Sequence, residues 1–157
     1  MVYQIDQSGK VEDTNKLTIV CVANGKIKTL KVSTREKQKL IATMRVLDYP
    51  KKIFIYKTFA ALIFLLIKEE KIINLSIDKE YPGHEAFIKE IILRFFRNNN
   101  LKSPTIDFCL VGKKSLAHKI AIETFRGKRK PNIIIKAENV IALFYTRKSQ
   151  KKVGVPT

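Results

Sequence analysis

The sequence predicts an α/β domain with a mixed β-sheet and helices on both of its faces. Three short apolar segments follow one another near the N-terminus with only turn-rich residues between them, which is typical of an antiparallel meander. The rest of the chain alternates apolar, strand-like runs with segments of helical periodicity, which is typical of strands connected by helices. We therefore expect one domain over residues 1–146, followed by a basic C-terminal tail at 147–157.

The meander is expected to use residues 1–5, 16–23 and 26–33, which read MVYQI, KLTIVCVA and KIKTLKVS. The segment DQSGKVEDTN separates the first two strands, and Asn24-Gly25 separates the second and third. That dipeptide favours a type I′ hairpin, because both central residues of such a turn need a positive φ.

The later elements follow from periodicity, capping residues and breakers. Ser33 or Thr34 is expected to cap the first helix, and Pro50 to end it. Thr58 is expected to open the second helix. A later helix is expected to begin at a Ser115 cap and to end at Gly127. We expect strands at 51–56, 71–78, 105–112 and 132–136, helices at 33–47, 58–70, 84–99 and 115–127, and a helix or a strand at 137–145.

The chain is strongly basic, with 31 Lys and Arg against 14 Asp and Glu and a net charge of +17. Such a surface attracts polyanions, so nucleic acid is the first partner to consider. The alternative is a lysine-rich surface that serves solubility or heat stability. The excess is uneven, because residues 108–157 hold twelve Lys and Arg against Glu123 and Glu138, a net +10. The oligomeric state is left open, with a homo-oligomer among the alternatives.

The two cysteines and the apolar runs indicate whether the protein forms disulfides or enters a membrane. Cys21 and Cys109 lie inside apolar strands, where a free thiol packs as a small hydrophobe, and the chain has no CxxC pair. The longest apolar run, at 59–67, is too short to span a bilayer. The first residues do not show the charged region and following apolar segment of a signal peptide, so none is expected. We expect a soluble, cytoplasmic protein without membrane contact.

Two stretches concentrate the positive charge. Lys113 and Lys114 stand between Gly112 and Ser115 at a predicted helix N-terminus, where backbone N–H groups and cations can hold a phosphate. The spacing is not that of a P-loop, so nucleotide hydrolysis is not expected. The second stretch, at 126–130, could bind the phosphate backbone of a nucleic acid. The alternative is a solvated loop whose cations interact favourably with the dipole at the C-terminus of the preceding helix. The cations of this stretch are Arg126, Lys128, Arg129 and Lys130.

Acidic residues gather at two predicted strand ends. Asp6 ends the first strand, and the segment SIDKEYPGHE places Asp78, Glu80, His84 and Glu85 close together just after another strand. Converging carboxylates of this kind hold the divalent ions that cleave phosphodiesters. Each acid also has a purely structural interpretation, because turns and the first turn of a helix favour acidic residues. Weaker alternatives for the site are Asp107, His118 and Glu12.

Three strands in a meander, then alternating helices and strands, with Asp6 in YQIDQSG on the first strand, resemble the ribonuclease H-like superfamily over residues 1–125. Nucleases and resolvases of that superfamily hold two divalent metals between carboxylates from the central first strand, a neighbouring strand end and a helix. Asp78 is the second match. The chain departs at 51–56, predicted as the fourth strand, because many members carry an acid at its end and this chain has Lys57.

The resemblance implies a divalent-metal-dependent nuclease that hydrolyses phosphodiester bonds in DNA or RNA with Mg²⁺ or Mn²⁺. Asp6, Asp78 and Glu80 are the expected metal ligands, and Glu85 joins them in the expected catalytic set. The expected nucleic-acid-binding residues are Lys113, Lys114, Arg126, Lys128, Arg129 and Lys130. The alternatives are a catalytically inactive nucleic-acid-binding module of the same fold, which Lys57 favours, and a structural protein with an incidental basic surface.

Overall fold

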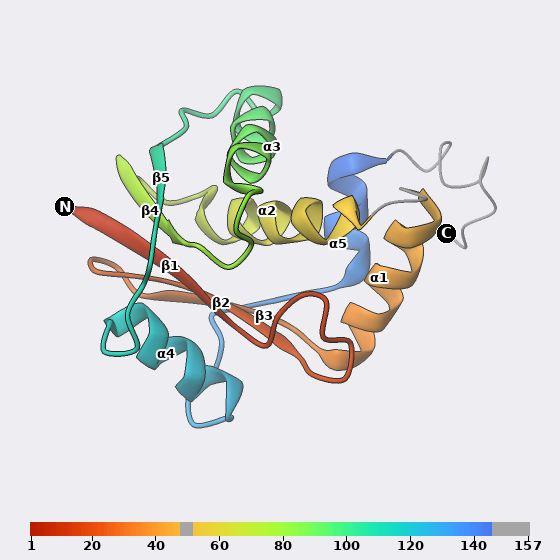
Figure 1. The fold of residues 1–157 in the computed structure, drawn as a ribbon, viewed down its shortest axis with the longest axis horizontal. Coiled ribbons are helices and arrows are strands. Elements are labelled where there is room, and N and C mark those ends of the chain that lie inside the picture. The colour runs from red at the N-terminus through yellow and green to blue at the C-terminus, as the bar shows by residue number, and fades with distance from the viewer. Residues whose placement is uncertain (48–51, 146–157) are drawn as a thin grey trace.

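The computed structural model describes residues 1–47 and 52–145, and within them the chain forms one six-stranded mixed sheet and five helices (Figure 1). The strands are β1 Val2–Ser8, β2 Thr18–Ala23, β3 Lys28–Val32, β4 Asn74–Asp78, β5 Thr105–Cys109 and β6 Ile133–Ile135. The helices are α1 Thr34–Leu47, α2 Ile53–Ile67, α3 Glu85–Asn98, α4 Leu116–Phe125 and α5 Ala137–Phe144. The predicted stop at Pro50 and the predicted tail 147–157 lie outside the described residues.

The strand order is β5-β4-β1-β2-β3-β6, so β1 lies inside the sheet between β4 and β2. The meander pairs are antiparallel, whereas β4 runs parallel to β1, β5 parallel to β4 and β6 parallel to β3. The predicted α/β class and mixed sheet are confirmed. The parallel pairing of β1 with β4 brings the carboxyl ends of these two strands together.

The sheet is covered on both faces, as predicted, but unequally. Figure 1 shows α2, α3, α5 and α1 on one side and α4 alone on the other. The large face carries the main core, which includes Ile5, Leu75 and Ile77 from the strands. On the other face α4 packs on β1 and β2 through a small cluster centred on Cys21, Ala117 and Ala121. Small side chains at these positions let the helix lie close to the strands.

Residues 51–56 were predicted as a strand, and this prediction is wrong over its described residues, because Ile53 begins α2. Thr58 was predicted to open a helix but lies buried within α2. The β-branched and aromatic residues at 53–56 favour a strand by propensity, yet the helix is buried on nearly all sides, so its sequence lacks a polar face. The fourth strand is β4 instead, and Lys57 lies on a helix.

The predicted type I′ turn is also wrong. Asn24 has a φ of 73°, but Gly25 is outside the left-handed region, and the connection runs over residues 24–27. A Cβ on Gly25 would lie 2.5 Å from Cζ of Tyr3, so glycine lets the outer end of that ring lie against the backbone here. The remaining caps agree with prediction: Ser33 accepts from Glu36 N at 3.2 Å and Ser115 from His118 N at 3.2 Å.

Among the described residues, no helix combines the length and the apolar character needed to cross a lipid bilayer. The 15 residues of α2, the longest helix in these ranges, are instead covered by the sheet and by α3.

Gly9→Ala should destabilise the protein strongly. Gly9 directly follows β1 with a φ of +76°, and a Cβ there would lie 2.0 Å from the carbonyl oxygen of Leu17. Gly127 has a nearly equal φ of +77° with nothing within 4 Å, so Gly127→Ala is the matched control. We expect the control to cost about 1–2 kcal/mol for the left-handed backbone alone. Gly9→Ala should cost at least about 3 kcal/mol in denaturant unfolding because the backbone must also move, and equal costs would contradict this assignment.

Candidate metal centre

Three carboxylates converge at the carboxyl ends of β1 and β4. Asp6, Asp78 and Glu80 each offer an oxygen within 4.8 Å of the others, a spacing at which they could hold a metal ion. The register pairs Ile5 with Ile77, which brings the next residues, Asp6 and Asp78, side by side. Because strand side chains alternate, both acids face away from the main core, toward the side that carries α4. The three predicted metal ligands therefore lie together.

Asp6 is the most deeply placed of the three, with 2% of its surface exposed. Its Oδ1 accepts a hydrogen bond from the backbone N–H of Gln7 at 2.9 Å. Its Oδ2 lies 2.8 Å from Nδ1 of His118, which α4 presents one turn after its Ser115 cap. Burial raises the pKa of Asp6, and the hydrogen bond from His118 opposes that rise.

Asp78 and Glu80 are fixed by the segments that follow β4 and β5. Asp78 Oδ1 accepts from the backbone N–H of Val111 at 2.8 Å, which ties the start of the β5–α4 connection to the acids. Glu80 is largely buried, with 13% of its side chain exposed, and its Oε2 lies 4.0 Å from Nζ of Lys10. Burial, together with the neighbouring Asp78, raises the pKa of Glu80 to about 8. The cluster therefore keeps a proton at neutral pH that a divalent cation would displace.

The donor set fits Mg²⁺ or Mn²⁺ rather than a softer metal. These ions prefer oxygen ligands, and carboxylates that crowd together are relieved of their repulsion by a divalent cation. Cys21 lies opposite Asp6 in the sheet. Its burial, and to a lesser extent the negative charge of Asp6, raises the pKa of its thiol to about 12. At neutral pH it stays protonated, so it offers no thiolate ligand.

The other sequence candidates lie outside this trio. Glu85 stands in the first turn of α3, and its Oε2 is buried without a hydrogen-bond partner among the described residues. His84 stacks on the ring of Tyr56 with a centroid distance of 3.9 Å. Glu12 accepts from the hydroxyl of Tyr81 at 3.0 Å, and Asp107 is exposed on β5.

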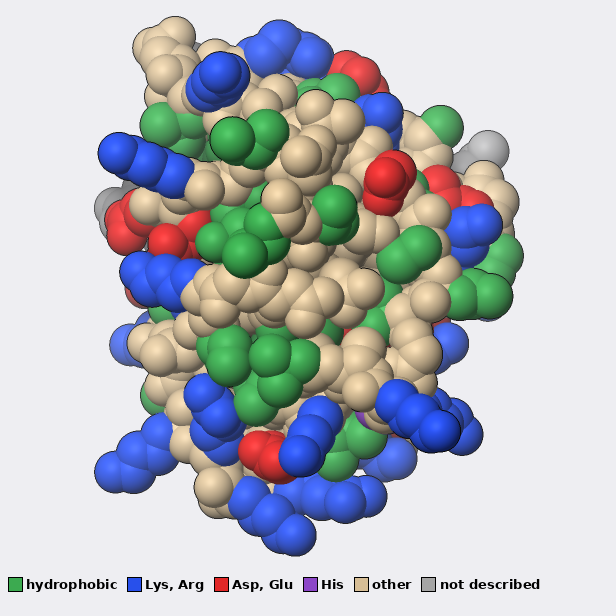
Figure 2. All heavy atoms as spheres, turned by 90° about the vertical axis from the view of Figure 1, so that its left-hand side faces the viewer, with side chains coloured by type: hydrophobic (Ala, Val, Ile, Leu, Met, Phe, Trp, Pro, Cys, Tyr) green, Lys and Arg blue, Asp and Glu red, His purple; other side chains and the backbone are tan. Residues whose placement is uncertain are grey.

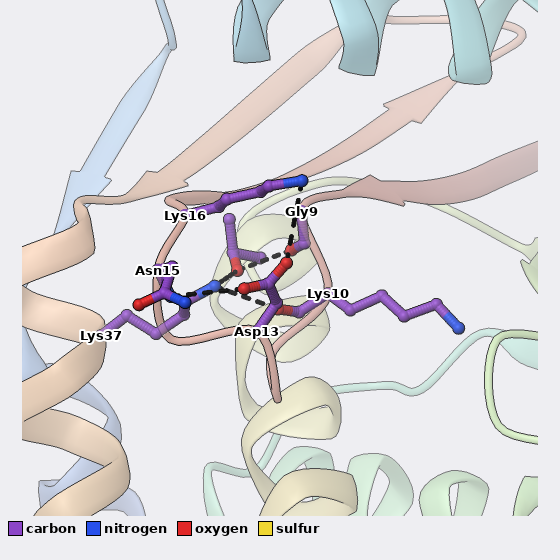
Figure 3. Close-up of polar contacts among 7 residues, drawn as sticks. Gly9, Lys10, Asp13, Asn15, Lys16 and Lys37 are labelled. Atoms are coloured by element: carbon purple, nitrogen blue, oxygen red, sulfur yellow. Dashed lines mark hydrogen bonds and ion pairs between the residues drawn. The ribbon is translucent and has the colours of Figure 1, made fainter.

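The loop at 9–17, which borders the centre, is anchored by a buried lysine. Figure 3 shows Lys37 of α1 reaching under this loop, where its Nζ donates to the Lys10 carbonyl and to Thr18 Oγ1, both at 3.0 Å. Only 1% of Lys37 is exposed, and burial lowers its pKa to about 8. Lys37 thus fixes the segment from which Lys10 extends toward Glu80 and Glu12 toward Tyr81.

Sequence reasoning missed Lys37 and gave little weight to His118. The spacing 37, 40, 41, 44 places Lys37 on the apolar face of α1, and this was the available signal that it is buried. For His118 the local sequence offers no comparable signal, because its partner Asp6 lies 112 residues away.

The predicted basic residues lie on both sides of α4. Lys113 and Lys114 are exposed in the turn before the helix, and Arg129 is half-buried beyond its end. Figure 2 shows Lys and Arg side chains gathered at the lower end of one face, the end at which Figure 1 places α4. The positive charge of Arg129 opposes the rise in the pKa of Cys21, which pairs with Asp6 across β1 and β2. Arg129 therefore contributes positive charge near the acids.

Glu80→Gln should remove a pH dependence of stability. Between the ordinary glutamate pKa and about 8, folded Glu80 holds a proton that the unfolded chain has released. Raising the pH through this window therefore costs the folded state stability in the wild type but not in the variant. With a chelator present, the free energy of unfolding of the wild type should fall from pH 5 to pH 8 because of Glu80, and that of Glu80→Gln should lack this fall. The difference, variant minus wild type, should therefore increase over this range. Glu90→Gln, at an exposed ion pair, should leave the pH dependence unchanged, and a parallel response of both variants would refute the assignment.

Comparison with protein-family models, with curated proteins and with solved structures finds no match for this chain.

Proposed function

We propose that this protein is a divalent-metal-dependent nuclease of the ribonuclease H-like type that hydrolyses phosphodiester bonds in DNA or RNA. The observation that carries the proposal is the trio Asp6, Asp78 and Glu80, whose oxygens lie within 4.8 Å of one another on the side of the sheet that carries α4, a helix with basic residues before and after it. A cluster of acids inside a chain of net charge +17 is expected where cations mediate contact with a polyanion.

The strand arrangement supports the resemblance. In that superfamily the carboxylates come from the central first strand, a neighbouring strand end and a helix. Here Asp6 is on β1, inside the sheet, and Asp78 is at the end of the adjacent β4. The departure at Lys57 no longer counts against the site, because that residue belongs to α2 and not to a strand. The helix position is taken by His118 in place of a carboxylate.

Bound Mg²⁺ or Mn²⁺ would neutralise the charge of a phosphate and activate the attacking water. Asp6, Asp78 and Glu80 would hold the ion. His118 would keep the Asp6 carboxylate in its orientation, since a hydrogen-bonded partner fixes a metal-ligating group. Glu85, predicted as catalytic, remains a candidate for the same reaction from the start of α3.

The basic residues around α4 would bind the backbone of the substrate. Lys113 and Lys114 precede the helix in the segment that Val111 ties to Asp78, so a phosphate on this turn lies near the acids. Beyond the helix, four further cations extend the surface: Arg126, Lys128, Arg129 and Lys130.

Asp6→Asn and Asp78→Asn should abolish cleavage but not binding. Each removes a metal-ligating charge, so we expect a loss of at least about 100-fold in cleavage of labelled DNA or RNA with Mg²⁺ or Mn²⁺. The substrates are single strands, duplexes and an RNA/DNA hybrid. Asp107→Asn is the matched control, because Asp107 is exposed on β5 outside the trio, and it should cleave as the wild type does.

A wild type that binds nucleic acid but cleaves none of these substrates would refute the nuclease proposal. That result would support the alternative, a catalytically inactive nucleic-acid-binding module of the same fold. The observation that favours this alternative is the helix position, where a histidine stands and not a carboxylate.

Replacing Lys113 and Lys114 together by Ala should weaken binding in a salt-dependent way. Each phosphate contact releases about one counterion, so the slope of log affinity against log salt should fall by about 1–2. Fluorescence anisotropy with a labelled oligonucleotide in chelator measures this. Lys39→Ala and Lys89→Ala remove exposed charges from α1 and α3 and serve as controls; an equal fall of the slope in these controls would contradict a specific surface.

A further inference from the structure

An open hollow of about 340 Å³ lies between the N-terminal ends of α2 and α3, and the metal centre does not account for it. It is lined by Lys52, Ile53, Tyr56, His84 and Phe87. Its volume falls in the range of roughly 300–1,000 Å³ that is typical of small-molecule sites.

Aromatic rings form the wall of this hollow. His84 stacks on Tyr56 with a centroid distance of 3.9 Å and an interplanar angle of 18°. Phe87 meets Tyr56 edge to face at 6.5 Å and 78°. All three side chains are half-buried, so the stack does not close into the core and keeps surface in contact with solvent. Such a stack is a ready platform for another flat, aromatic group.

The hollow and the carboxylates lie on opposite faces of the sheet, and Tyr81 follows the last of the three acids in the chain and contacts the hollow. Tyr81 follows Glu80 directly, and its ring meets Tyr56 edge to face with centroids 5.5 Å apart. Its hydroxyl accepts from Gln7 Nε2 at 3.1 Å and donates to Glu12 at 3.0 Å, so Tyr81 also contacts β1 and the loop at 9–17 that borders the metal centre. Gln7 is adjacent to Asp6, and its own Oε1 is buried without a partner among the described residues.

The rim carries positive charge. Lys52 is exposed at the start of α2, and the positive ends of the α2 and α3 dipoles both face this region. Within the described residues, neither helix has a side chain that caps its first N–H groups. An occupant that combines a flat aromatic group with a nearby anion fits both features.

We propose that this hollow binds an unpaired nucleobase of the strand whose phosphate reaches the metal centre. The inference rests on the proposed function and narrows its substrate class. A base within a duplex is held by its partner and cannot stack on Tyr56 and His84 without first unpairing. The substrate is therefore single-stranded, or has an unpaired nucleotide beside the cleaved bond.

Binding in chelator tests this inference separately from cleavage. The probes are a labelled single-stranded oligonucleotide and a blunt duplex of the same length. We expect Tyr56→Ala and His84→Ala each to weaken single-strand binding about tenfold, the loss typical of one stacked base, and to leave duplex binding unchanged. Tyr56→Phe should bind as the wild type does, because it keeps the ring. Tyr3→Ala, at the opposite end of β1, is the aromatic control and should also have no effect.

A direct readout uses a single strand that carries 2-aminopurine, whose fluorescence is quenched when it stacks. The wild type and Tyr56→Phe should quench it at one position along the strand, and Tyr56→Ala should not. Unchanged single-strand affinity in both alanine variants, or an equal loss for single strand and duplex, would overturn the inference. A protein that cleaves no substrate but shows these binding differences would refute the nuclease proposal and leave the base site standing.

Discussion

The parallel pairing of β1 with β4 is the contact on which the candidate site depends. The pairing of Ile5 with Ile77 puts Asp6 beside Asp78, and the same two isoleucines are buried in the main core. A shift of the register by one residue would turn every side chain of the strand to the other face, so core packing also fixes the carboxylates. The placement of Asp6 beside Asp78 is thus a consequence of apolar burial, which brings the two carboxylates together although like charges repel.

The acids stay together because neighbouring groups offset their repulsion. His118, the N–H of Gln7 and the N–H of Val111 each bond to a carboxylate oxygen, and Glu80 keeps its proton to about pH 8. These groups come from different parts of the chain. The carboxylates are preorganised, because folding has already brought their negative charges close together. A divalent cation bound to them would remove that repulsion.

Much of this could be read from the sequence. The meander, the amphipathic α3 and the trio Asp6, Asp78 and Glu80 were predicted, because alternation, helical periodicity and strand-end acids are local signals. α2 was split wrongly into a strand and a helix, because a helix buried on all sides loses the polar face that marks its period. Contacts between distant segments, such as that of His118 with Asp6, leave no local pattern, and neither does the hollow at Tyr56.

The far edge of the sheet has a consequence for how the chain is completed during synthesis. β3 pairs on its outer side with β6, a hundred residues later, and Asn132 reinforces the junction by accepting from Thr29 N at 2.8 Å and donating to Thr29 O at 3.1 Å. Until the ribosome has released residues 132–135, β3 presents a bare edge that other strands can join. The meander is synthesised first, but the outer edge of its third strand is covered last. Chains that end before β6 should therefore aggregate, even though they already contain Asp6, Asp78 and Glu80.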